Sequence, residues 1–234
     1  MPAWKIFMIQ FLNIAGLGPI FGAIMGAKFG TASYLWIVLG SIFAGAVHDF
    51  LSGMISLRND GESLPETIGR YLGSRFKQFM RIFSVLLMVL VGAVFVAGPA
   101  GLLAKLTPDS LDLTFWATVV FVYYVLATLL PIDKIIGKIY PLFAIALIFM
   151  AVGILTMLFW HHPSLPELTD GVANTHPDGL PIFPMMFVSI ACGAISGFHA
   201  TQSPMMARCM TSEKYGRPVF YGAMITEGIV ALIW

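Results

Sequence analysis

Four ionisable side chains stand inside long apolar stretches of the sequence: His48, Asp49, His199 and Glu227. A charge at the centre of a bilayer costs about 2.5–3.5 kcal/mol on insertion scales, so such residues usually mark an ion or substrate pathway. Carboxyl groups removed from water, and histidine, can bind and release protons near neutral pH. We therefore predict that His48, Asp49 and Glu227 take part in proton coupling. The alternative for Asp49 is structural, as a buried acceptor between packed helices.

Two further stretches combine helix breakers with polar side chains in apolar surroundings. They are residues 13–19, which read Asn-Ile-Ala-Gly-Leu-Gly-Pro, and residues 193–204, which hold two glycines, a histidine and a proline. A proline inside a helix costs about 3 kcal/mol, and glycine weakens the helix further. Backbone that leaves the helix is tolerated in lipid only where it faces protein or a wet cavity. The alternative is a pair of kinked, closely packed helices.

We predict that these two stretches line a substrate site. Half-helix ends offer N–H groups to an anion and carbonyl groups to a cation. Glycine and proline would shape the unwound backbone, and the polar side chains would contact substrate. The residues predicted to bind substrate are Gly16, Gly18, Pro19, Ser196, Gly197, His199, Thr201 and Gln202. The other histidines, His161, His162 and His176, lack a metal-ligand spacing, and we expect them in a solvated loop.

The composition is that of a membrane protein. Of 234 residues, 58% are hydrophobic and 11% are charged, and the mean hydropathy is +0.86. Soluble domains carry roughly 25% charged residues, so this chain has too few to cover a surface in water. The net charge of +1 provides no basic face for nucleic acid. We expect an integral membrane protein whose partners are the lipid bilayer and a small-molecule substrate.

Seven apolar stretches are long enough, or nearly so, to cross about 30 Å of hydrocarbon as helices. The hydrophobic runs are continuous rather than alternating, which favours an all-α protein with about seven transmembrane helices. The expected spans are 6–27, 31–57, 82–104, 113–132, 139–160, 180–207 and 218–234.

Basic residues indicate the orientation, because cytoplasmic loops are enriched in Lys and Arg. The connector 58–81 is rich in arginine, so we place it in the cytoplasm. Alternation of the seven spans then puts eleven of the thirteen basic residues inside, all except Lys28 and Lys105. We expect a multi-pass protein with a cytoplasmic N-terminus.

The two interrupted stretches lie in the first and sixth expected spans, so five helices separate equivalent points. A second five-helix unit then begins on the opposite side of the membrane, and paired broken helices are typical of such inverted repeats. We predict part of a five-plus-five (APC/LeuT-like) transporter fold with discontinuous helices 1 and 6. Its parts are a first repeat over 1–160, with the connector 58–81, an exterior loop over 161–181, and the start of a second repeat over 182–234. Because Trp234 lies inside the seventh apolar run, we expect this second repeat to be truncated.

At these residues the chain resembles the carbon starvation protein (CstA) family of transporters. The matching stretches, in order, are Ile-Ala-Gly-Leu-Gly-Pro-Ile at 14–20, Leu-Trp-Ile at 35–37 with Gly-Ala-Val-His-Asp-Phe at 45–50, and Ile-Ala-Cys-Gly-Ala-Ile-Ser-Gly-Phe-His-Ala at 190–200. The resemblance covers nearly the whole chain, although family members are much longer. It implies a bacterial or archaeal inner-membrane protein with the five-plus-five repeat, which takes up peptides or pyruvate with protons during nutrient starvation.

We therefore expect a secondary active transporter, represented by its N-terminal part, that takes up a peptide or pyruvate with protons. Sodium is the alternative coupling ion, because unwound carbonyl groups can bind it. Other interpretations are a channel lined by the broken helices, and a membrane sensor or assembly subunit in which the breaks are hinges. The sequence has no nucleophile triad, phosphate-binding loop or dinucleotide fingerprint, so we expect neither enzyme activity nor a bound cofactor or metal.

Overall fold

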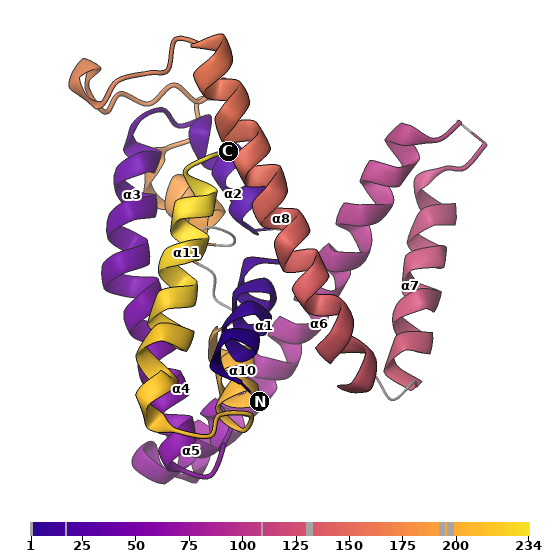
Figure 1. The fold of residues 1–234 in the computed structure, drawn as a ribbon, viewed down its shortest axis with the longest axis vertical. Helices are drawn as coiled ribbons and strands as arrows, with labels where there is room; N and C mark the ends of the chain where they lie inside the picture. The colour runs from indigo at the N-terminus through magenta and orange to yellow at the C-terminus, as the bar shows by residue number, and fades with distance from the viewer. Residues whose placement is uncertain (1, 17, 109, 130–132, 192–194, 196–198) are drawn as a thin grey trace. The chain divides into compact units, whose positions relative to one another are not determined.

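The computed structural model describes residues 2–16, 18–108, 110–129, 133–191, 195 and 199–234; of residues 133–141 and 170 it describes the backbone only. Helices make up 80% of the structure, and no strand occurs among the described residues. The prediction of an all-α protein is confirmed (Figure 1). The chain forms two compact units, Met1–Thr67 with Tyr140–Trp234, and Ile68–Ile139.

The first unit contains the two sequence stretches that carry helix breakers. Its helices are α1 (Ala3–Ala15), α2 (Gly18–Ala27), α3 (Ala32–Gly40), the π-helical turn η1 (Ser41–Gly45), α4 (Ala46–Arg58), the part of α8 (Asp133–His161) from Tyr140 onward, η2 (Leu168–Asp170), η3 (Ile182–Met186), α9 (Phe187–Ala191), α10 (His199–Ala207), η4 (Glu213–Tyr215), η5 (Arg217–Tyr221) and α11 (Gly222–Ala231). The short helix α5 (Leu64–Leu72) follows α4.

The main hydrophobic cluster of the first unit includes residues of α1, α2, α9 and α11, and a second cluster joins α1 to α10 and η5. Phe11 and Ile14 of α1 are fully buried together with Ile190 of α9 and Met224 of α11. These side chains belong to one hydrophobic cluster, so the core lies where the interrupted helices meet α11. Close-packed side chains resist rearrangement, so this cluster holds the adjoining backbone breaks in fixed positions.

The loop 161–181, which is expected on the exterior, closes over the turn between α2 and α3. Thr31 Oγ1 donates to the carbonyl of Gly171 at 2.6 Å, and Thr175 Oγ1 donates to the carbonyl of Lys28 at 3.0 Å. His176 is buried with its ring centroid 4.5 Å from that of Phe29. The expectation that His176 is solvated is therefore wrong, because the loop folds back onto the helix turn.

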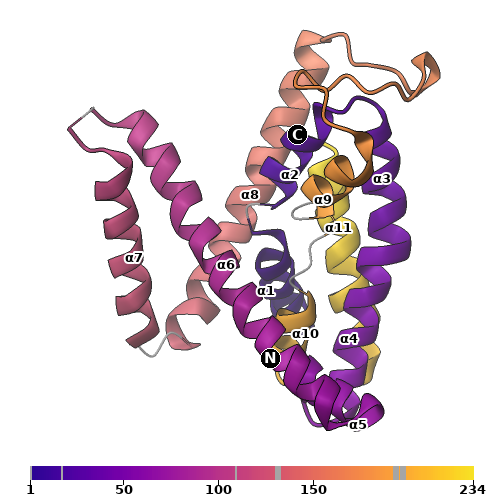
Figure 2. The ribbon, with the colours of Figure 1, turned by 180° about the vertical axis from the view of Figure 1, so that it is seen from behind.

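The second unit is a hairpin of α6 (Ser74–Leu106) and α7 (Leu113–Leu129) (Figures 1 and 2). The short connection makes the two helices antiparallel neighbours. Trp116 Nε1 donates to Thr107 Oγ1 at 2.9 Å, and Tyr124 Oη donates to the carbonyl of Phe95 at 3.2 Å. Among the described residues of these two helices only Ala100 is buried, as expected for helices that face lipid.

Three helices of the described structure are long and apolar enough to cross a membrane: Ala32–Arg58, Ser74–Leu106 and Leu142–His161. The bent pair α1–α2 makes a fourth if it is counted as one span. Leu113–Leu129 and Ile182–Ala191 are shorter apolar helices. The third span starts at Ser74 rather than at the expected residue 82 because its polar first turns continue the same helix beyond the apolar run.

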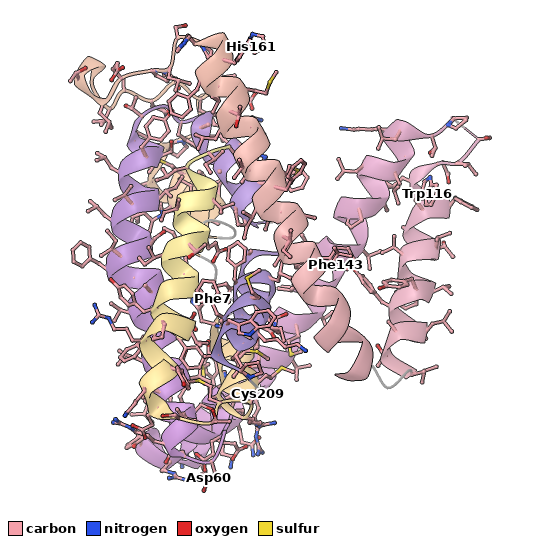
Figure 3. All side chains as sticks on the ribbon, in the orientation of Figure 1. Phe7, Asp60, Trp116, Phe143, His161 and Cys209 are labelled. Atoms are coloured by element: carbon pink, nitrogen blue, oxygen red, sulfur yellow. The ribbon has the colours of Figure 1, made fainter. Side chains whose placement is uncertain are left out.

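The loops that are expected on the two sides of the membrane lie at opposite ends of the first unit. Asp60, in the expected cytoplasmic connector, lies at the end that also holds Cys209, and His161 lies at the other end (Figure 3). This arrangement agrees with the alternation of spans that the basic residues indicate.

Candidate substrate and ion site

The first break separates α1 from α2. The helix α1 ends at Ala15, α2 begins at Gly18, and their axes are bent by 43°. Gly16 has φ 48° and ψ −130°, a conformation that residues with a Cβ rarely adopt, so glycine is required there. Gly18 and Pro19 are buried in the first turn of α2, where proline is tolerated because its missing N–H would be unpaired in any case.

The second break separates α9 from α10. The helix α9 ends at Ala191 and α10 begins at His199. Between them, the N–H group of Ile195 donates to the carbonyl of Ile190 at 3.3 Å. The predicted substrate residues Ser196 and Gly197 lie outside the described residues. Thr201 and Gln202, on α10, are half-buried.

The four half-helices pack crosswise: α1 packs against α10, and α2 packs against α9 (Figure 2). Each pair therefore joins one half of the first interrupted helix to one half of the other. The N-terminal ends of α2 and α10, at Gly18 and His199, both begin at a break. Helix N-termini offer N–H groups and partial positive charge, and helix C-termini offer carbonyl groups and partial negative charge. The C-terminal ends at the breaks are Ala15 of α1 and Ala191 of α9.

Asp49 lies at the centre of a fully buried polar cluster. Gln10 Nε2, from α1, donates to both Asp49 carboxylate oxygens at 3.0 Å. The same nitrogen lies 3.4 Å from Ser203 Oγ on α10, and Ser203 Oγ itself donates to Asp49 Oδ1. Gln10, Asp49 and Ser203 are each 0% exposed. One side chain of α4 thus connects the half-helices α1 and α10.

The two predicted histidines lie beside each other. His199, the first residue of α10, is buried, and its Nε2 lies 3.0 Å from the sulfur of Met224 on α11. The rings of His48 and His199 have centroids 5.5 Å apart. His48 is exposed within the described structure whereas its neighbour Asp49 is buried, as expected for residues that point about 100° apart on a helix.

Glu227 is fully buried on α11, and neither carboxylate oxygen has a hydrogen-bond partner among the described residues. It lies one helical turn after Met224, on the same buried face. The next residue, Gly228, packs so closely on η1 that a Cβ there would lie 2.5 Å from Ser41 Oγ. Glu227 thus belongs to the part of α11 that faces the interrupted helices.

The structure therefore brings His48, His199 and Met224 into one group, and Asp49 into another with Gln10 and Ser203. Sequence reasoning missed Gln10 and Met224 as site residues, and it placed Ser203 in a site-lining stretch without giving it a role. Gln10 carries the clearest signal that could have revealed it, because it is the one strongly polar side chain in the apolar run of residues 6–12. A buried amide of this kind needs a partner.

Comparison with known proteins identifies the family. The model of the carbon starvation protein CstA family matches residues 1–111 and 102–234. A Haemophilus influenzae protein named an uncharacterized membrane protein is 43% identical over all of this chain and 76% of its own length. The peptide transporter CstA of Campylobacter jejuni is 32% identical, and the pyruvate/proton symporter BtsT of Escherichia coli is 28% identical.

The matches to these two transporters cover 97% and 98% of this chain and 41% of each relative. The chain therefore spans about two fifths of their length. No solved structure matches it. The family match covers the whole chain, and so the chain belongs to the carbon starvation protein CstA family.

Proposed function

We propose that this chain forms the substrate-binding part of a secondary transporter that carries a small anionic or zwitterionic nutrient, a peptide or pyruvate, into the cell with protons. The names of its relatives, peptide transporter and pyruvate/proton symporter, support this class of substrate. The proposed location is the inner membrane, with the N-terminus in the cytoplasm.

The crosswise packing of α1 with α10 and of α2 with α9 carries the proposal. Two helices that are broken at corresponding positions and packed in opposite directions are the pattern of an inverted repeat. The substrate then lies between four helix ends, and alternating access follows when one pair of half-helices moves relative to the other. This packing supports the five-plus-five architecture that the position of the breaks predicts.

The helix ends define the chemistry of the substrate. N–H groups at the starts of α2 and α10 would bind a carboxylate, which peptides and pyruvate share. Gly16, Gly18, Pro19 and Gly197 would allow the substrate to approach the backbone. The polar contacts would come from Ser196, His199, Thr201 and Gln202. Carbonyl groups at the ends of α1 and α9 would accept hydrogen bonds from the ammonium group of a peptide.

Proton coupling would use His48, Asp49 and Glu227. All three lie on α4 or α11, two helices that pack against each other. The helix α11 also packs against α1, and Asp49 of α4 accepts hydrogen bonds from Gln10 of α1. An ionisable group inside the membrane is costly unless it has a partner or a function. Its change of charge can therefore be coupled to movement of the half-helices.

The test is transport by the purified full chain in liposomes. An acidic exterior should drive saturable uptake of labelled dialanine or pyruvate, and a pH dye should report acidification of the lumen as substrate enters. A protonophore should stop accumulation. A sodium gradient that drives uptake without a pH gradient would contradict proton coupling. Linear flux without saturation would favour a channel, and binding without flux would favour a sensor.

A further inference from the structure

The two buried carboxyl side chains among the described residues of the first unit have opposite surroundings. Asp49 accepts hydrogen bonds from Gln10 and Ser203, which together direct three contacts at its two oxygens. Glu227 accepts none from any described residue. Both side chains are 0% exposed, so they differ in their hydrogen-bond partners and not in their burial.

The partners of Asp49 suit its ionised form. Gln10 presents an NH₂ group to both oxygens at once, and Ser203 adds a hydroxyl donor. Hydrogen bonds to an ionised carboxylate are stronger than those to a neutral one. The negative charge also holds together side chains from α1, α4 and α10, so its loss would weaken the contact between the half-helices α1 and α10.

The surroundings of Glu227 suit its neutral form. On the same face of α11, Met224 and Ala231 are buried apolar residues, and Gly228 makes close contact with Ser41. An ionised carboxylate in such a site without donors is strongly disfavoured. A cation that neutralises it is therefore required, and a proton is the cation that needs no further ligands.

Ionisable groups on the neighbouring elements do not supply a counter-charge. The elements that contact α11 carry the following ionisable side chains: Lys5 on α1, Tyr34 on α3, His48, Asp49 and Arg58 on α4, His199 on α10, and Arg217 and Tyr221 on η5. None of the described groups forms a hydrogen bond with a Glu227 oxygen, and the one carboxyl group among them is that of Asp49. Its negative charge repels a second one at Glu227.

We infer that Glu227 is the residue that takes up the coupling proton. We also infer that Asp49 stays ionised and links α1 to α10 through its hydrogen bonds with Gln10 and Ser203. The inference rests on the proton coupling proposed above. The sequence assigned that coupling to both Asp49 and Glu227, whereas the contacts of the two side chains distinguish them. One O–H bond forms on a Glu227 oxygen when the proton enters, and the same bond breaks when the proton leaves on the cytoplasmic side.

Infrared spectroscopy of the purified full chain in detergent tests the assignment without transport. At neutral pH the spectrum should contain the C=O band of a protonated carboxyl group that shifts in heavy water. Glu227→Gln should remove this band, whereas Asp49→Asn should leave it. The matched control Glu213→Gln alters an exposed carboxylate that pairs with Arg58, and it should also leave the band.

Carbon-13 labelling decides the same question without any substitution. The band should shift when the glutamate carboxyl carbons are labelled and should stay when only the aspartate carboxyl carbons are labelled. Absence of the band from the wild-type chain, or a band that follows aspartate, would overturn the inference. A band that disappears on addition of sodium at constant pH would overturn it too, because the site would then bind sodium.

Transport assays distinguish failure of this inference from failure of the proposed function. If the wild-type chain accumulates substrate, Glu227→Gln should retain exchange of labelled for unlabelled substrate and lose accumulation driven by a pH gradient. A Glu227→Gln variant that still accumulates substrate in response to the pH gradient would refute the assignment. If the wild-type chain moves no substrate, the proposed function fails, and the infrared band still decides which carboxyl group holds the proton.

Discussion

Gln10 and Asp49 lie 39 residues apart in the sequence, and Gln10 Nε2 is 3.0 Å from both carboxylate oxygens of Asp49. Ser203, from the far side of the second break, completes the cluster. A single acidic side chain thus holds the first half of one interrupted helix against the second half of the other.

Removal of the Gln10 amide should destabilise the protein. In Gln10→Ala, Asp49 keeps only the Ser203 donor, and a buried polar group that loses its partner costs about 1–3 kcal/mol. The thermal unfolding midpoint of the chain in detergent should fall clearly. Asn13→Ala is the matched control, because Asn13 lies on the same helix and is half-buried; its midpoint should change little. Equal midpoints for the two variants would contradict the role of Gln10.

Gln10→Ala and Ser203→Ala should not be additive. Both side chains donate to the same carboxylate, and residues of one hydrogen-bond network usually show interaction energies of about 0.5–3 kcal/mol. The double variant should therefore differ from the sum of the single ones in unfolding free energy by an amount in this range. Additive losses would mean that the two donors act independently.

Much of the fold follows from local sequence, because span length and helix breaks are local properties. The apolar run at 31–57 predicts the helix Ala32–Arg58 almost to its ends. The Gly-Leu-Gly-Pro stretch predicts the end of α1 at Ala15 and the start of α2 at Gly18. Backbone sterics at glycine and proline suffice for this prediction.

The partners of the ionisable residues could not be predicted in the same way. Sequence reasoning selected Asp49 and Glu227 for their charge, and nothing local distinguishes them. Their difference arises from tertiary packing, which places Gln10 and Ser203 beside one carboxyl group and no described donor beside the other. The structural alternative for Asp49, a buried acceptor between packed helices, describes its contacts correctly.

The close approach of α11 to η1 predicts a second stability effect. A Cβ at Gly228 would lie 2.5 Å from Ser41 Oγ and 2.9 Å from Ser41 Cβ, so Gly228→Ala should cost about 1–3 kcal/mol through overpacking. Gly92→Ala is the matched control on α6, where no described heavy atom beyond the neighbouring backbone of the same helix lies within 4 Å of the added methyl group. It should be neutral or stabilising by up to about 1 kcal/mol. Thermal midpoints of the two variants check this, and an unaffected Gly228→Ala would contradict the tight contact.

The conformation of Gly16 predicts loss of function from a single methyl group. A residue with a Cβ at φ 48°, ψ −130° is strained by roughly 1–3 kcal/mol, so Gly16→Ala should shift the end of α1. Substrate uptake should fall more than in Gly153→Ala, a helical site with nothing within 4 Å. Normal uptake by Gly16→Ala would mean that this backbone does not shape the site.

Cysteine labelling can determine the orientation. In a background with Cys192→Ala and Cys209→Ala, Val172→Cys would lie in the expected exterior loop and Glu213→Cys in an expected cytoplasmic one. Both positions are exposed. A membrane-impermeant maleimide should label Val172→Cys in intact cells, and Glu213→Cys only after the membrane is opened. The reverse pattern would place the N-terminus outside.

The helix ends at the breaks predict how the substrate is recognised. Two helix N-termini, at Gly18 and His199, begin at the breaks, and each can favour an anion by up to about 2 kcal/mol when partly buried. Since 1.4 kcal/mol corresponds to a tenfold change in affinity, amidation of the substrate carboxylate should weaken competition for uptake at least tenfold. Acetylation of a peptide's amino group should have a smaller effect, because it leaves the carboxylate intact. Competition by unlabelled analogues against labelled dialanine or pyruvate measures both, and an amidated analogue that competes as well as its parent would exclude carboxylate binding at these ends.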